Sequence, residues 1–145
     1  MRYLDTSSLV ALYYPEAKTA RLEARLRSRR SRLPLTWLHE LELTNGLQLK
    51  IFRGEGTEAN VAATLGAVRA DVESGAFFRP QLAWAPVFDG ALRLSAVYSR
   101  QLGTGTLDLL HVAAASLLEA IEFITSDQRQ SDLAKREGLK VALIL

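Results

Sequence analysis

Residues 2–14 read Arg-Tyr-Leu-Asp-Thr-Ser-Ser-Leu-Val-Ala-Leu-Tyr-Tyr, and this stretch decides the fold class. The short apolar start at residues 2–4 predicts a strand. Asp5 to Ser8 then offer side-chain caps for a helix over the apolar residues that follow. A strand that runs directly into a helix begins the strand–helix alternation that is typical of a parallel sheet.

The same alternation continues to the end of the chain. Helices are expected at about 16–30, 37–53, 57–73, 86–101, 107–120 and 128–137, strands at 33–36, 122–125 and 140–145, and a strand or buried loop at 77–84. Such alternation predicts an α/β fold of three layers, with a central parallel sheet of about four to five strands and helices on both faces. Because no linker, repeat or low-complexity segment interrupts it, we expect a single domain over residues 1–145.

The composition excludes several classes of protein. The chain is 48% hydrophobic with a net charge of +2, which excludes intrinsic disorder. The absence of cysteine excludes disulfide scaffolds, zinc ribbons and thiol nucleophiles, and it suits the reducing cytoplasm. Asp5 interrupts any signal peptide, and the longest apolar run, 109–121, is too short to cross a bilayer. We therefore expect a soluble, cytoplasmic protein with no membrane partner.

The basic charge is concentrated in one segment. Residues 18–32 contain seven basic side chains and a single acid, Glu23. Such a segment is either a solvated helix face or a contact surface for an anion such as nucleic acid, and the sequence leaves both interpretations open.

Four acidic residues fall where an α/β sheet binds its ligands, at the carboxyl ends of the strands. Asp5 and Asp127 directly follow predicted strands, while Glu42 and Asp108 lie near the starts of helices expected to frame the same edge. Because clustered carboxylates repel one another, such a cluster persists only with protons or cations. Oxygen ligands without a His or Cys cluster favour Mg²⁺ or Mn²⁺, which indicates metal-assisted hydrolysis at phosphorus.

Each of these acids also has a purely structural interpretation. Asp5 and Asp127 are suitable helix N-caps, and Asp108 lies in a first turn, where the helix dipole favours an acid. Glu42 competes with Glu40, because residues two apart on a helix point about 200° away from each other and only one of them can face a site. Periodicity does not decide between the two glutamates.

Four segments resemble the acidic motifs of the PIN domain family. They are Leu4-Asp5-Thr6-Ser7-Ser8-Leu9-Val10, Glu42-Leu43, Asp108-Leu109-Leu110-His111-Val112-Ala113 and Phe123-Ile124-Thr125-Ser126-Asp127. The resemblance covers nearly the whole chain, and the order and spacing of the motifs make it specific. Within the family, the short single-domain form is most similar to the VapC toxins of bacterial and archaeal type II toxin–antitoxin pairs.

The resemblance implies a PIN-like fold and an endoribonuclease that uses Mg²⁺ or Mn²⁺ to hydrolyse RNA phosphodiester bonds. The implied partners are an RNA substrate, a cognate antitoxin protein and a second copy of the chain in a homodimer. The implied catalytic and metal-binding residues are Asp5, Glu42, Asp108 and Asp127, with Thr6 and Thr125 in support. Glu42 is preferred to Glu40 because Glu-Leu-x-x-x-Leu is the usual form in the family.

The implied roles of the four acids differ. Asp5 and Asp108 would be direct metal ligands, and Glu42 a ligand or the holder of a bound water. Asp127 would be a water-mediated ligand or part of a second metal site. His111 lies one helical turn after Asp108, so it is either a general base or a hydrogen-bonded core residue, whereas we expect a second histidine, His39, at the surface.

Other functional classes fit the residues less well. A haloacid dehalogenase-like phosphatase needs a second acid two residues after its nucleophilic aspartate, and Ser7 occupies that position here. A response-regulator receiver needs paired acids near the first strand, which Arg2 and Asp5 do not provide. No phosphate-loop or dinucleotide-binding glycine motif occurs. A PIN-like module that binds RNA or a peptide without cleavage remains the alternative.

Overall fold

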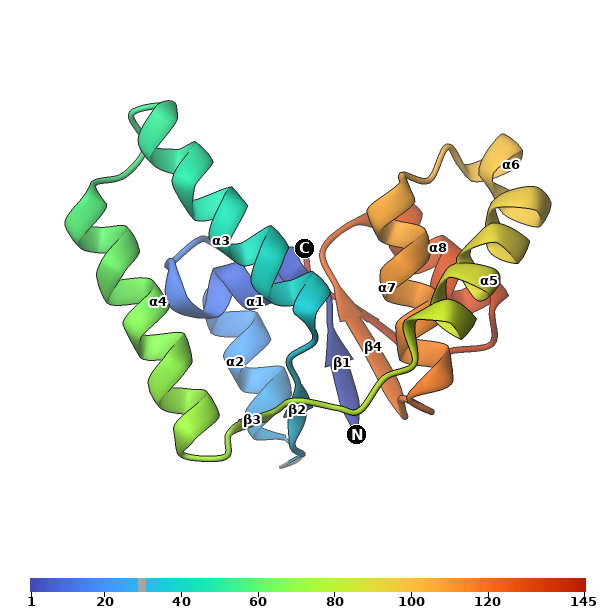
Figure 1. The fold of residues 1–145 in the computed structure, drawn as a ribbon, viewed down its shortest axis with the longest axis horizontal. Coiled ribbons are helices and arrows are strands. Elements are labelled where there is room, and N and C mark those ends of the chain that lie inside the picture. Colours follow the sequence, from blue (N-terminus) through green and yellow to red (C-terminus); the bar gives the residue numbers. More distant parts are fainter. Residues whose placement is uncertain (29–30) are drawn as a thin grey trace. The chain divides into compact units, whose positions relative to one another are not determined.

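Strands from the two ends of the chain lie side by side in one sheet. The computed structural model describes residues 1–28 and 31–145. In it, β1 (Arg2–Leu4) pairs in parallel with β4 (Glu122–Thr125), and β4 pairs in parallel with β5 (Val141–Leu143). The resulting strand order is β1-β4-β5, and Figure 1 shows β1 and β4 side by side. The α/β class with a parallel sheet, predicted from the sequence, is confirmed.

A second, smaller sheet joins β2 (Leu33–Pro34) to β3 (Phe77–Phe78), again in parallel. The described residues thus contain five strands, which pair as a sheet of three and a sheet of two. The sequence predicted a strand over 33–36, but β2 ends at Pro34 because Thr36 caps the next helix. Pairing between strands is a long-range property, so the local pattern that locates strands does not assign them to sheets.

The residues form two compact units, which are described separately. The first unit comprises Met1–Asp5 and Gln81–Leu145, and the second unit comprises Thr6–Pro80. Besides β1, β4 and β5, the first unit contains α5 (Trp84–Leu94), η1 (Ser95–Ser99), α6 (Arg100–Leu102), α7 (Thr106–Leu117) and α8 (Gln128–Arg136). Besides β2 and β3, the second unit contains α1 (Thr6–Tyr13), α2 (Thr19–Arg27), α3 (Trp37–Phe52) and α4 (Glu58–Glu73). A single domain over residues 1–145 stays a prediction.

Helix α7 is the buried helix of the first unit. Seven consecutive residues, from Leu109 to Ala115, are buried, and α7 packs against both α5 and α8. Gly90 on α5 allows a close approach, since a β-carbon at this position would lie 3.3 Å from the β-carbon of Ala113. The small side chain of Ala113 therefore lets α5 pack closely against α7.

The second unit has its own apolar core beneath α1, α3 and α4. Its fully buried members are Leu9, Leu35, Leu43, Leu47, Val61, Val68 and Phe77. Helix α4 begins where the sequence predicts, because the side chain of Thr57 accepts a hydrogen bond from the Asn60 N–H. This core fixes α3, and so it also fixes the two glutamates that α3 carries.

Several boundaries differ from those expected. The helix predicted over 16–30 is described as α2 from Thr19 to Arg27, and residues 29 and 30 lie outside the described part of the chain. The helix expected to begin at Pro86 begins at Trp84, and a π-helical turn at Ser95–Ser99 follows it. The final strand, expected over 140–145, is the shorter β5 at Val141–Leu143, and it is half-buried.

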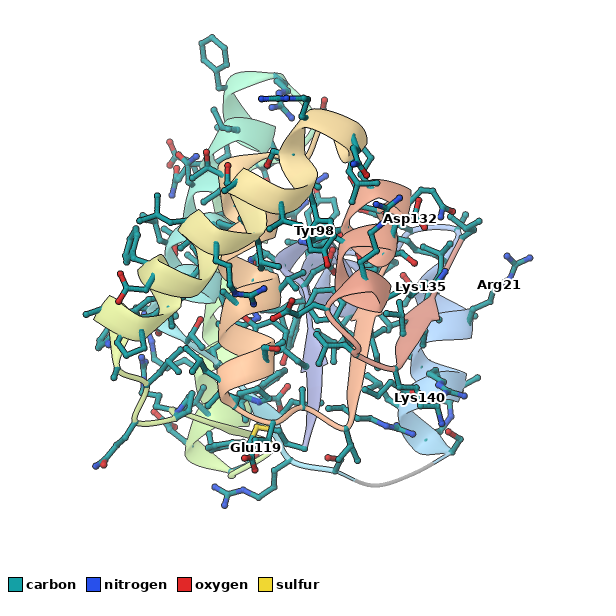
Figure 2. The ribbon with its side chains drawn as sticks, turned by 90° about the vertical axis from the view of Figure 1, so that its right-hand side faces the viewer. Arg21, Tyr98, Glu119, Asp132, Lys135 and Lys140 are labelled. Atoms are coloured by element: carbon teal, nitrogen blue, oxygen red, sulfur yellow. The ribbon has the colours of Figure 1, made fainter. Side chains whose placement is uncertain are left out.

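Side chains on α8 face both its sheet and its neighbouring helices. Figure 2 shows Tyr98 beside the part of α8 that carries Asp132 and Lys135, and the Tyr98 hydroxyl donates to the carbonyl oxygen of Arg136 at 3.5 Å. In the same figure Arg21 of the basic segment extends away from the ribbon into solvent.

Within the described residues, none of the helices has the length and apolar character needed to cross a membrane.

Candidate functional site

Asp5 lies at the carboxyl end of β1, where the sheet edge begins. The residue is 3% exposed, and its N–H donates to the carbonyl oxygen of Ile124 on β4 at 2.9 Å. Its Oδ2 accepts a hydrogen bond from the hydroxyl of Thr125, at 2.8 Å. Because β1 and β4 are parallel neighbours, the residues that end them lie at the same edge, as the sequence predicted.

Thr125 continues this contact to a residue that the sequence analysis did not single out, Gln130. The Thr125 hydroxyl lies 2.8 Å from Oε1 of Gln130, and Nε2 of Gln130 donates to Oδ1 of Asp108 at 3.2 Å. Both linking side chains are buried. Thr125 has only one proton to donate, so in any one state either Asp5 or Gln130 receives it. Two neutral side chains thus connect the carboxylates of Asp5 and Asp108.

Asp108 lies in the first turn of α7, where its Oδ2 accepts a hydrogen bond from the Gly105 N–H at 3.0 Å. Burial raises the pKa of the Asp108 carboxyl, and the negative charge of Asp127 raises that pKa further. The Gly105 N–H and the positive charge of Arg129 act in the opposite direction. Asp108 therefore holds its negative charge at an energetic cost, which a bound cation would relieve.

Asp127 is the N-cap of α8. Its Oδ1 accepts hydrogen bonds from the N–H groups of Arg129, at 2.7 Å, and Gln130, at 3.1 Å, while its own N–H donates to the Thr125 hydroxyl at 3.0 Å. The guanidinium of Arg129 lies 3.8 Å from Oδ2 of Asp127 and donates to the Gly103 carbonyl at 3.3 Å. The capping role and a role in a site are therefore compatible in the same side chain.

Gln130 could have been found from the spacing Asp127-x-x-Gln130. This spacing is that of a capping box, in which the Gln side chain returns to the N–H of the cap residue. Here that N–H is already bound by Thr125, so the Gln130 amide is directed to Thr125 and Asp108 instead. The sequence identifies the helix start but not this diversion.

The two competing glutamates of α3 have different partners within the second unit. Both carboxylate oxygens of Glu40 accept hydrogen bonds from the guanidinium of Arg79. Glu42 accepts a hydrogen bond from the hydroxyl of Thr6 at 2.7 Å. Glu40 is thus neutralised by an arginine, and the Thr6 hydroxyl fixes the direction of one carboxylate oxygen of Glu42. Glu40 is therefore the weaker candidate for a metal ligand, and the role of Glu42 in a site stays a prediction.

Both histidines are buried. The Tyr3 hydroxyl and Nδ1 of His111 are 2.8 Å apart, and His111 is 2% exposed, which supports the interpretation as a hydrogen-bonded core residue. The expectation that His39 lies at the surface is wrong, because it is 1% exposed. Its Nδ1 accepts from the N–H of Thr36 and completes the cap of α3, a role in which His replaces the usual Glu or Gln.

The donor atoms of this site suit a hard divalent cation. Asp5, Asp108 and Asp127 offer carboxylate oxygens, which are the ligands that Mg²⁺ and Mn²⁺ prefer. Among residues 1–28 and 31–145, no three His, Asp or Glu side chains are already arranged to hold a metal ion. Their carboxylates make the hydrogen bonds described above, and the chemistry of this set of oxygen donors fits the ion.

Comparisons with known proteins agree with this picture. A family model described as the PIN domain matches residues 2–136. Among solved structures, the chain is similar to one titled "Crystal Structure of FitAcB from Neisseria gonorrhoeae", with a TM-score of 0.66 and 19% sequence identity. The similarity covers 97% of this chain and 96% of the other, and at this identity it shows a shared fold. The comparison with curated protein sequences gave no match.

Proposed function

Since this chain belongs to the PIN domain family, we propose that it is a Mg²⁺- or Mn²⁺-dependent endoribonuclease that hydrolyses RNA phosphodiester bonds as a VapC-like toxin. The line of polar contacts from Asp5 through Thr125 and Gln130 to Asp108 carries the proposal. Neutral donors fix the direction of a carboxylate without cancelling its charge, which leaves that charge for a cation. A purely structural acid would be better served by an arginine, as Glu40 is.

In this proposal Asp5 and Asp108 are direct ligands of the ion, and Asp127 holds it through water or binds a second one. Glu42 is assigned as a further ligand or as the holder of a bound water. When bound, Mg²⁺ or Mn²⁺ supplies a water of lowered pKa and positive charge near the phosphate oxygens. Thr125 and Gln130 hold Asp5 and Asp108 in position, and their role resembles that of the outer partners that orient metal ligands elsewhere.

The test is cleavage of a structured RNA mixture by the purified protein, with Mn²⁺ or Mg²⁺ and with a chelator. We expect fragments only when the metal is present. A folded protein that binds RNA equally well with the chelator and never cleaves it would favour the alternative, a PIN-like binding module. That alternative has one observation in its favour, namely that the described side chains include no preformed three-residue ligand group.

The raised pKa of Asp108 predicts how metal binding depends on pH. As the pH falls through this pKa, Asp108 takes up a proton and loses its affinity for the ion, and this happens at a higher pH than for an ordinary aspartate. Arg129→Gln removes a charge that lowers this pKa, so we expect the acid limb of the Mn²⁺-affinity profile to move to higher pH. Isothermal titration calorimetry of Mn²⁺ binding, repeated across the acidic pH range, measures this shift. Arg136→Gln, on the same helix, is the control. Equal shifts in both variants would contradict the assignment of Asp108 as the ligand whose pKa Arg129 lowers.

The proposal extends to location and partners. A toxin of this class acts in the cytoplasm, and its antitoxin would insert a basic side chain among the acids of the site.

The second proposed partner is another copy of the chain. Helix α5 exposes two large apolar residues one turn apart, Phe88 at 54% and Leu92 at 68%. Apolar side chains at this spacing form a stripe that a second copy can cover.

Leu92→Asp is expected to convert the homodimer to a monomer, because it places a charge in the centre of the apolar stripe. Light scattering coupled to size-exclusion chromatography measures the mass directly. Leu117→Asp is the matched control, since Leu117 is also exposed, at 47%, and belongs to α7 of the same unit. A wild-type protein that is monomeric at micromolar concentration would contradict the homodimer.

A further inference from the structure

An exposed tryptophan is held in a fixed orientation on the second unit. Trp37 is the first residue of α3, and 68% of it is exposed. The central carbon of the Arg79 guanidinium lies 4.9 Å from the centroid of the Trp37 ring. Trp37 thus presents a large aromatic surface to solvent in a defined position.

Glu40 fixes the arginine that covers the ring. Nη2 of Arg79 donates to Oε1 of Glu40 at 2.6 Å, and Nη1 donates to Oε2, so the planar guanidinium is bound at two points. A bidentate pair of this kind sets the orientation of the plane as well as its position. Glu40, Arg79 and Trp37 therefore form a stack of defined order, which we call the Trp37 platform.

The backbone beneath the platform is also rigid. Thr36 and His39, which cap the first turn of α3, are buried and hydrogen bonded to each other. The preceding residue, Leu35, donates its N–H to the Phe78 carbonyl at 2.9 Å, next to Arg79 in the chain. A ring that is ordered before binding loses little conformational entropy when a ligand stacks on it.

A second guanidinium–ring contact involves Phe78, the residue of β3 that directly precedes Arg79. The guanidinium carbon of Arg32, an exposed residue at the end of the basic segment, lies 4.6 Å from the centroid of the Phe78 ring. Residues 78 and 79 thus each take part in an arginine–aromatic contact. Alternating aromatic rings and guanidinium groups are the features with which proteins bind single-stranded nucleic acid, by base stacking and by attraction of the phosphates.

We propose that the Trp37 platform stacks an unpaired base of the RNA substrate, and that Trp37 is a substrate-positioning residue outside the acidic site. This inference rests on the proposed ribonuclease function for the identity of the ligand. Stacking is tolerant of base identity because every base has a flat π-face, so the platform would favour single-stranded over paired RNA without reading a sequence.

The fluorescence of Trp37 tests the proposal without any cleavage. The chain has two tryptophans, so Trp84→Phe leaves Trp37 as the single emitter. With a chelator present to prevent hydrolysis, a single-stranded oligoribonucleotide is expected to quench Trp37 emission roughly twofold at saturation, as stacked bases do. An abasic oligomer of equal length and charge is the probe control, and it should leave the emission nearly unchanged.

Variants separate stacking from simple loss of structure. Trp37→Leu should weaken oligoribonucleotide binding about tenfold, and Trp37→Phe should restore part of it, because a phenyl ring still stacks. In cleavage assays Trp37→Leu should raise KM with little change in kcat, since the Trp37 side chain carries no group that would bind the ion. Arg79→Gln should also weaken binding by freeing the ring, whereas Arg53→Gln should not, because Arg53 is an exposed arginine at the opposite end of α3 from Trp37.

Three results would overturn the proposal. The first is that the oligoribonucleotide does not bind, or binds without quenching Trp37. The second is that the abasic oligomer quenches Trp37 equally. The third is that Trp37 emission changes with protein concentration in the absence of RNA. The last would assign the ring to contact between copies of the chain. Failure of the wild type to cleave RNA with metal present would contradict the proposed function, and the fluorescence result is obtained independently of it.

Discussion

Asp108→Asn is expected to reduce metal-dependent RNA cleavage by at least about 100-fold, the scale on which removal of one charged or oxyanion-stabilising group acts in other enzymes. The substitution keeps the shape of the side chain and the acceptor for the Gly105 N–H, but it removes the negative charge that would bind the ion. The initial rate of cleavage with Mn²⁺, compared between the variant and the wild type, measures the effect.

The stability of the same variant separates lost chemistry from lost folding. The pKa of Asp108 is raised in the folded protein, so its ionised form is disfavoured there, and the stability that this group contributes is lost as the pH rises through its pKa. At neutral pH the variant should therefore melt no earlier than the wild type. Asp132→Asn, whose carboxylate accepts from Gln128 at 2.9 Å on the same unit, is the matched control for activity. Normal cleavage by Asp108→Asn would overturn the assignment of the acidic site.

Local signals in the sequence locate most of the elements. Asp127 was predicted as a helix cap, and its side chain accepts the N–H bonds that define a cap. The strand over Glu122–Thr125 was predicted with its actual bounds. These features depend on a few neighbouring residues, and the preferences of capping and β-branched residues act over that range.

Long-range contacts explain what the sequence left open. Periodicity could not decide between Glu40 and Glu42, because the decisive fact is the position of Arg79, which comes 39 residues after Glu40. His39 was expected at the surface because the cap it completes normally uses another residue type. The division of five strands into two sheets likewise depends on pairing between distant segments.

The candidate site shows the same division between local and long-range information. The resemblance to one family selected Asp5, Asp108 and Asp127, and the structure brings them together through Thr125 and Gln130. Thr125 was expected in a supporting role, but the contacts it makes were not predictable from its position after a strand. Motifs thus identified the charged residues, while the buried neutral residues that orient them required the structure.

The sheet of the first unit contains a buried ion pair whose disruption should cost the fold a large part of its stability. Nε of Arg2 lies 3.3 Å from Oε2 of Glu122, and each side chain is 5% exposed. The two residues are register partners across β1 and β4, and the next pair along, Tyr3 and Phe123, stacks with ring centroids 5.6 Å apart. The strands are therefore joined by complementary side chains as well as by backbone hydrogen bonds.

Glu122→Gln is expected to destabilise the fold by about 3 kcal/mol, because it removes the carboxylate beside a buried guanidinium and leaves the cost of burying that positive charge. Urea unfolding followed by circular dichroism measures the free energy. The double variant Arg2→Met with Glu122→Met should recover most of the loss, since neither charge is then buried and the volume is nearly kept. If the single and double variants were equally unstable, packing rather than charge would be the contribution of these residues, and the ion-pair argument would be wrong.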